Sequence, residues 1–171
     1  SEAQQEQWIP KMLNGEARIG FGLTEPLHGS DATWMETTAT RDGDEWVITG
    51  EKYWNTGLHH ATHDYIFART SGEPGEGTGI TCFIVPTDSA GFQVEEFMWT
   101  FNMPTDHAHV TLNQVRVNHA DILGEEGKGL QTAQLFVHEN RIRQAASSLG
   151  AGLHCIDIAV EWASNRVVFG K

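Results

Sequence analysis

Apolar and polar side chains alternate in short runs before residue 118, a pattern typical of β-strands with one buried face. These runs lie at 19–23, 37–40, 46–49, 65–69, 80–85, 92–98 and 107–117. The second and third runs flank Arg41–Asp42–Gly43–Asp44, where the Asp-Gly step indicates a β-hairpin. Because six or seven strands follow one another without a long helix between them, we predict a small antiparallel β-barrel or sandwich.

The last of these runs changes its pattern partway along. Val110 and Leu112 share one face of the predicted strand, whereas Val115 and Val117 have the opposite parity. A β-bulge near Asn113–Gln114 would bring all four side chains to the same face, because a bulge adds one residue to one strand of a pair. We therefore predict a single long strand with a bulge.

After residue 127 the hydrophobic period changes to spacings of three and four. The residues that recur in this way, here called the seam, are Ile142, Ala146, Leu149, Leu153, Ile156, Val160, Ala163 and Val167. They predict a helix of about 35 residues, about 50 Å long, that packs in an antiparallel bundle or coiled coil. Either the chain oligomerises through the seam or it belongs to a longer protein with further helices, and the end at Lys171 favours the second.

Shorter elements flank the strands. Ser1–Leu13 predicts a short helix that Ser1 caps and that Pro10 ends or kinks. Ser71–Gly79 contains four glycines, one proline and two glutamates, so we expect a mobile loop. The following Ile80–Val85 is apolar on both parities, as expected of a strand covered on both faces.

Composition narrows the possible functions. The 171 residues include 23 acidic and 11 basic ones, which argues against nucleic acid or an anionic membrane as the main partner. No apolar run approaches the length of a membrane span, and the N-terminus lacks a signal-peptide pattern. Cys82 and Cys155 lie far apart in apolar settings, so we expect two buried, reduced thiols and a reducing compartment.

The candidate chemistry is concentrated in the segment LTEPLHGSD, at residues 23–31. It follows an apolar run and contains the turn formers Pro26, Gly29, Ser30 and Asp31. A concave run of backbone amides with a serine hydroxyl can hold phosphate oxygens. The alternative is a surface turn between two strands, because glycine-serine turns are common.

Three blocks in this order resemble the acyl-CoA dehydrogenase family: LTEPLHGSD, then GEKYWNTG at 50–57, and ENRIRQAASSLGAG running through to NRVVFGK at 139–171. The resemblance implies an α+β fragment of a larger three-domain protein. Its parts would be the end of an N-terminal helical domain (1–15), the middle β-barrel domain (16–124) and the first long helix of a C-terminal helical bundle (125–171). It also implies FAD, bound between the middle domain and the C-terminal helices, and α,β-dehydrogenation of an acyl-CoA thioester.

By the same resemblance, Phe21, Leu23, Thr24 and Ser30 belong to the flavin-contacting segment. Thr24 would donate to the pyrimidine side of the flavin through its backbone amide and hydroxyl, where donors stabilise the negative charge of the reduced ring. Ser30 would lie near the FAD pyrophosphate and the bound acyl-CoA. The alternative for Thr24 is a strand-end hydroxyl bonded to a neighbouring carbonyl.

Trp54 and Thr56 match the family's Trp-x-Thr step. Trp54 would pack its indole on the isoalloxazine and screen it from water, and Thr56 would hydrogen-bond flavin N5, which accepts the hydride. The alternative for Trp54 is a half-buried strand aromatic. Asn55 is polar where many members of the family carry an apolar residue.

Arg166, Val168 and Phe169 match a segment that reaches the FAD of a neighbouring subunit in the family. The planar guanidinium of Arg166 could donate twice to a pyrophosphate. The alternative is a solvated arginine at a helix end. The resemblance therefore also implies a homodimer or homotetramer.

Arg141 matches an arginine that contacts the nucleotide portion of CoA, and a solvated or salt-bridged arginine is an equal alternative. Some relatives carry the catalytic carboxylate at the position of Asn140, which cannot act as a base. Glu139 lies about 100° away around the helix and points elsewhere. We therefore expect no catalytic residue in this sequence and a base beyond Lys171.

The histidines suggest a metal site only weakly. His59, His60 and His63 form one set and His107 and His109 another, but neither brings a carboxylate or cysteine at ligand spacing. We expect loop or surface histidines and no metal.

The alternatives to a dehydrogenase are an acyl-CoA oxidase, a flavin-dependent monooxygenase or a non-catalytic binding module. The expected partners are acyl-CoA and an electron-transfer flavoprotein or similar acceptor, in the cytoplasm or a mitochondrial matrix.

Overall fold

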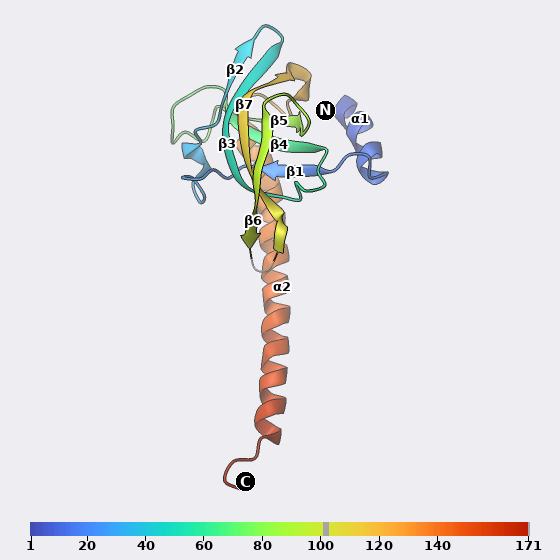
Figure 1. The fold of residues 1–171 in the computed structure, drawn as a ribbon, viewed down its shortest axis with the longest axis vertical. Coiled ribbons are helices and arrows are strands. Elements are labelled where there is room, and N and C mark those ends of the chain that lie inside the picture. Colours follow the sequence, from blue (N-terminus) through green and yellow to red (C-terminus); the bar gives the residue numbers. More distant parts are fainter. Residues whose placement is uncertain (101–102, 171) are drawn as a thin grey trace. The chain divides into compact units, whose positions relative to one another are not determined.

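The computed structural model describes residues 1–100 and 103–170 and confirms the α+β class (Figure 1). Its elements in chain order are α1 (Glu2–Leu13), β1 (Ile19–Gly22), the 3-10 helix η1 (Ala32–Trp34), β2 (Thr38–Asp42), β3 (Glu45–Thr56), β4 (His63–Arg69), β5 (Ile80–Pro86), β6 (Phe92–Thr100), β7 (Met103–Asn118), the 3-10 helix η2 (His119–Asp121) and α2 (Gly129–Asn165). They form two compact units: Ser1–Ala133, with all seven strands, and Gln134–Lys171, with the rest of α2.

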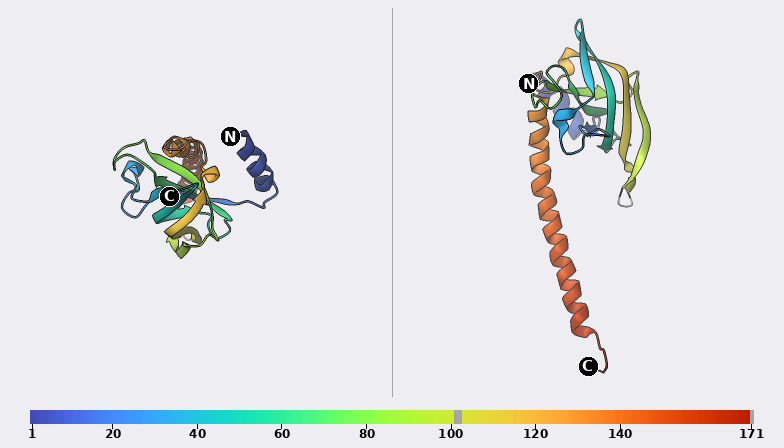
Figure 2. Two further views of the ribbon diagram at one scale, coloured as in Figure 1. Left: turned by 90° about the horizontal axis from the view of Figure 1, so that it is seen from above. Right: turned by 90° about the vertical axis from the view of Figure 1, so that its left-hand side faces the viewer.

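The strands form one curled sheet (Figure 2). Their order is β1-β4-β2-β3-β7-β6, and β5 pairs with β4 in antiparallel. Most neighbours are antiparallel, as predicted. However, β1 runs parallel to β4, and β2 meets β4 in parallel at Thr38 and Arg69. The sheet is therefore mixed and not wholly antiparallel, because the β2–β3 hairpin supplies the crossover that parallel neighbours require.

The predicted hairpin and bulge are both present. β2 and β3 pair in antiparallel from the turn at Asp42 and Glu45 onward. In β7, Asn113 and Gln114 together lie opposite the single residue Thr49 of β3, and Gln114 has a positive φ of 53°. As a result, the side chains before the bulge (Val110 and Leu112) and after it (Val115 and Val117) all lie on the buried face of the sheet.

The main core lies inside the curl of the sheet. It contains Trp46, Ile48, Ile66, Phe83, Val85, Val110 and Val115, among others. A second cluster lies on the other face of β4 and β5, where their alternate side chains pack against the first turns of α2. It contains Met35, Phe67, Ile80, Cys82 and Ala133. β5 is therefore covered on both faces, as the apolar run at 80–85 predicted.

The predicted N-terminal helix forms, and Ser1 caps it through a reciprocal pair of contacts with Gln4. The helix ends at Leu13, as predicted, so of the two effects expected of Pro10, an end or a kink, the end does not occur. Proline removes only one N–H donor, and the turn after it is closed by the Asn14 N–H, which donates to the Pro10 carbonyl at 3.0 Å.

α2 has 37 residues, close to the predicted length, but ends at Asn165, so Val167 of the seam lies outside it. Seam residues are largely exposed, for example Ile142 at 74% and Leu149 at 70%. Cys82 is buried as expected, whereas Cys155 is exposed, because it lies on the stretch of α2 that no described residue covers. In the part of the chain that the structure describes, no helix combines the length and apolar character needed to span a membrane.

Candidate functional site

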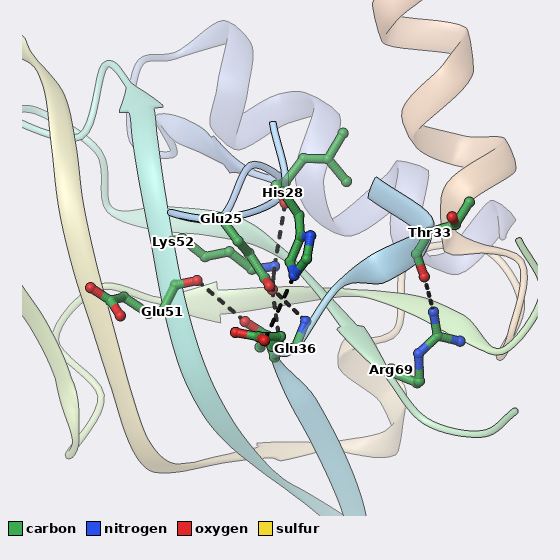
Figure 3. Close-up of polar contacts among 9 residues, drawn as sticks. Glu25, His28, Thr33, Glu36, Glu51, Lys52 and Arg69 are labelled. Atoms are coloured by element: carbon green, nitrogen blue, oxygen red, sulfur yellow. Dashed lines mark hydrogen bonds and ion pairs between the residues drawn. The ribbon is translucent and has the colours of Figure 1, made fainter. Parts of the chain in front are cut away.

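A buried ion pair fixes the LTEPLHGSD segment to β3 (Figure 3). Lys52 Nζ lies 2.8 Å from Glu25 Oε1, and neither side chain is more than 2% exposed. Glu25 also accepts hydrogen bonds from the backbone N–H groups of Glu36 and Thr37, and Lys52 donates to the Leu23 carbonyl. Burial by itself would raise the pKa of Glu25, but the Lys52 charge and these hydrogen bonds hold the pKa below its usual value.

β3 changes the face that it presents just before its end. Its register against β7 shifts between Lys52 and Asn55, so that Tyr53 and Trp54 together lie opposite one residue. Trp54 has a positive φ of 65°, a conformation that costs a non-glycine residue about 1–2 kcal/mol. This bulge leaves Lys52 and Asn55 fully buried, whereas Trp54 is 45% exposed and Thr56 is also exposed.

Thr24 lies beside the bulge, because its carbonyl accepts a hydrogen bond from the Tyr53 N–H at 2.9 Å. Among the described residues, the Thr24 hydroxyl makes no hydrogen bond with another protein group. The Thr56 hydroxyl makes only a long one, to the Trp54 carbonyl at 3.4 Å. The structure therefore brings Thr24, Trp54 and Thr56 together on two adjacent segments, with two hydroxyl groups available to a ligand.

The apolar residues Phe21 and Leu23 are half-buried against the second cluster. The Phe21 ring centroid lies 5.2 Å from that of Phe67. The two glycines of β1 face Asp64, on the side of the sheet that carries the main core. The side chain of Phe21 therefore lies on the opposite side, with the second cluster, and those of Trp54 and Thr56 also point away from the main core.

Ser30 is exposed at the end of the segment. The next residue, Asp31, caps η1 by accepting a hydrogen bond from the Thr33 N–H at 3.0 Å. Hydrogen bonds from the Thr33 hydroxyl and N–H lower the pKa of Asp31. Ser30 is thus next to a fixed turn, but nothing in the described residues gathers other phosphate-binding groups around it.

The remaining predicted residues belong to the second unit. Arg141 is exposed on α2, and Arg166, Val168 and Phe169 are exposed beyond its end. The guanidinium of Arg166 lies 5.8 Å from the ring centroid of Trp162, a cation–π contact within the same unit. The assigned roles of these four residues stay predictions.

Sequence reasoning missed the arginine that organises the glycine-rich loop. Arg69 is only 7% exposed, and its guanidinium donates to the carbonyl of Thr33 (Figure 3). It also donates to the carbonyls of Ser71, Glu76 and Thr78. It therefore ties η1 to the loop 71–79. The available signal was a charged residue at the end of an otherwise apolar strand.

The histidines lie near carboxylates. His59 and His107 lie 3.8 and 3.7 Å from Asp106, and His109 lies 2.5 Å from Glu51. Asp106 also accepts the N–H of Gly57, through its backbone carbonyl at 2.8 Å and its side chain at 3.1 Å. Within the described residues, no group of three or more histidines, cysteines or carboxylates is arranged to hold a metal ion.

Comparison with known proteins identifies close relatives. A family model described as acyl-CoA dehydrogenase, middle domain, matches residues 20–115. A 3-(aryl)acrylate reductase from Clostridium sporogenes is 36% identical, over 100% of this chain and 45% of that protein. The mitochondrial short-chain specific acyl-CoA dehydrogenase of Rattus norvegicus is 33% identical, over 99% of this chain and 41% of that protein. The structure of butyryl-CoA dehydrogenase from Megasphaera elsdenii matches with a TM-score of 0.86 and 33% identity, over 100% of this chain and 45% of that one. The chain thus spans less than half the length of these relatives.

Proposed function

The chain belongs to the acyl-CoA dehydrogenase family, and from this premise we propose that the full-length protein is an FAD-dependent dehydrogenase of acyl-CoA thioesters. Bound FAD would supply the hydride acceptor needed to introduce an α,β double bond. The observation that carries the proposal is the outward bulge of β3, which sets Trp54 and Thr56 beside Thr24.

The side chains at this bulge fit the chemistry of a flavin. In this proposal Thr56 donates to the ring nitrogen N5, and Thr24 donates to the pyrimidine edge, where negative charge gathers on reduction. The exposed indole of Trp54 covers the ring and excludes water, which strengthens the electrostatic interactions of the site. Phe21 and Leu23 supply apolar contacts on the same side of the sheet.

The second unit would contribute to binding. Arg166 would bind the pyrophosphate of FAD held by a neighbouring subunit, together with Val168 and Phe169, which requires a homodimer or homotetramer. Ser30 and Arg141 would contact the CoA. The proposed base lies beyond Lys171, the electron acceptor is an electron-transfer flavoprotein or similar protein, and the compartment is the cytoplasm or a mitochondrial matrix.

The direct test is anaerobic incubation of the FAD-loaded full-length protein with acyl-CoAs of several chain lengths. The visible absorbance of the flavin is expected to bleach with at least one of them, and absence of bleaching with all would contradict the proposal. The chain 1–171 by itself is expected to show no turnover, because the proposed base is not part of it.

Replacing Thr56 by valine should slow flavin reduction about tenfold or more, because it removes one hydrogen-bond donor without changing the size of the side chain. Stopped-flow absorbance at saturating acyl-CoA measures this rate. The matched control is Thr40→Val on exposed β2, which should leave the rate unchanged. Equal rates for Thr56→Val and the wild type would rule out the proposed contact with N5.

A second candidate is reduction of a free α,β-unsaturated aryl acid, favoured by the similarity to the 3-(aryl)acrylate reductase. Thr24 and Thr56 would hold the flavin in this reaction as well, and the reduced flavin would supply the hydride. Chemically reduced enzyme mixed anaerobically with an aryl acrylate would recover its flavin absorbance if this candidate is correct. Recovery with an enoyl-CoA alone would favour the dehydrogenase.

A further inference from the structure

Asn55 and Asp64 form a polar pair in the core that the proposed chemistry does not use. Both residues are fully buried, and Asn55 Nδ2 donates to Asp64 Oδ2 at 2.5 Å. In the described part of the chain, the other two oxygens of the pair, Asn55 Oδ1 and Asp64 Oδ1, have no hydrogen-bond partner. Both of these leftover atoms are acceptors, so the pair lacks a donor that a proton on Asp64 would supply.

The sequence of β1 makes room for this pair. A Cβ atom on Gly20 would lie 2.8 Å from Asp64 Oδ1, and one on Gly22 would lie 2.7 Å from Asn55 Nδ2. Such separations are far shorter than real side chains allow, so both positions need glycine. The two glycines of the IGFG strand thus leave space for a polar bridge between β3 and β4.

The bridge lies directly behind the candidate flavin contacts. Asn55 stands between Trp54 and Thr56 in β3, with its side chain inside the sheet and theirs outside. Trp54 adopts its unfavourable positive φ immediately before Asn55. Backbone strain persists only where the surrounding structure over-determines it. Here the buried bond of Asn55 adds to two backbone hydrogen bonds that flank the bulge, from the Tyr53 N–H to the Thr24 carbonyl and from the Gly57 N–H to the Asp106 carbonyl.

We propose that Asn55 and Asp64 are positioning residues: a buried acid–amide pair that holds the Trp54–Thr56 bulge in the conformation that contacts the flavin. The flavin part of this statement rests on the proposed function. The coupling of the pair to the bulge does not, because it is a property of the chain alone.

The raised pKa of Asp64 agrees with a proton on its carboxyl group that supplies the donor the Asn55–Asp64 pair lacks. Burial raises the pKa of Asp64 to about 7, although the Asn55 hydrogen bond, the Lys52 charge and the backbone N–H of Tyr65 act to lower it. Two titratable groups act on it electrostatically: Lys52 of β3, which is paired with Glu25, and the thiol of Cys82, which lies on β5 in the second cluster. Since the folded pKa lies above the unfolded value of about 4, the stabilising contribution is complete below pH ~4 and is lost as the pH rises through 7.

Hydrogen exchange in the full-length protein tests the coupling. Asn55→Val should raise the exchange rate of the backbone amides at 53–58 about tenfold or more, because the buried bond is lost, and leave the 39–48 hairpin within about twofold. Asp64→Asn keeps a hydrogen-bonding partner and should leave both segments unchanged at pH 6. Raising the pH from 6 to 8.5, after correction for intrinsic exchange, should loosen 53–58 in the wild type but not in Asp64→Asn. Similar increases in both segments of Asn55→Val would mean a general structural role and would overturn the proposal.

FAD binding tests the link to function separately. Asn55→Val should weaken FAD affinity about tenfold and shift the visible flavin spectrum, whereas Asp64→Asn should stay within about twofold of the wild type. Normal affinity and an unchanged spectrum in Asn55→Val would overturn the positioning role and leave the proposed function intact. Failure of the wild type to bind FAD would instead overturn the proposed function and the flavin role together, while the exchange result still decides whether the pair holds the bulge.

Discussion

Replacing Lys52 by methionine is expected to lower the free energy of unfolding by about 3–5 kcal/mol, because it leaves the buried carboxylate of Glu25 without its partner. Glu25 is 3% exposed, so water cannot replace the ammonium group. The two backbone N–H groups that it accepts from lie in the segment leading to β2, so the loss should also loosen LTEPLHGSD. Urea denaturation followed by tryptophan fluorescence measures the change.

Two control variants separate the buried charge from lost packing. The double variant Glu25→Gln/Lys52→Met removes both charges and should recover much of the stability, since a buried ion pair contributes little net stability over neutral groups. Arg116→Met removes an exposed cation that pairs with Asp42 and Glu45, and its effect should be too small to resolve. If Lys52→Met cost no more than Arg116→Met, the argument from burial would be wrong.

The two bulges of the sheet show where sequence reasoning is sufficient and where it is not. The bulge at Asn113–Gln114 was predictable, because apolar residues stand on both sides of it with opposite parity. The bulge at Tyr53–Trp54 was not predictable, because the polarity of Trp54 and of Asn55 assigns each side chain to the face of the sheet opposite to the one it occupies. Asn55 is polar but fully buried, and Trp54 is apolar but 45% exposed. Where a site reverses the usual relation between polarity and burial, the hydrophobic pattern cannot reveal its backbone.

Strand partners and buried charges escaped prediction for a related reason. β1 pairs in parallel with β4, although the β2–β3 hairpin separates them in the sequence. Neither strand has a residue pattern that identifies the strand with which it pairs. Lys52 and Glu25 are residue types that are almost never fully buried unless paired, so composition alone would place both on the surface. The motifs identified the segments that carry Thr24, Trp54 and Thr56, but their side-by-side placement depends on the hydrogen bond between Tyr53 and Thr24.

Within the second cluster, the start of α2 packs against β5 at a glycine. A Cβ on Gly129 would lie 2.6 Å from the Cys82 nitrogen and 2.7 Å from the Thr81 carbonyl carbon. These are backbone atoms of a strand covered on both faces, so they cannot move aside as a flexible side chain could. The neighbouring Leu123 N–H donates to the Cys82 carbonyl at 2.8 Å, which fixes the connection in the same place.

Gly129→Ala is therefore expected to destabilise the chain by about 3 kcal/mol, the upper end of the usual cost of overpacking, because the helix start must move away from β5. Gly150→Ala is the matched control in the same helix: nothing lies within 4 Å of its Cβ position, and alanine favours a helix over glycine by about 1 kcal/mol. The two identical substitutions should thus change the stability of the 171-residue chain in opposite directions. Urea denaturation monitored by circular dichroism measures both, and stabilisation by Gly129→Ala would show that β5 and the helix start are not in contact in solution.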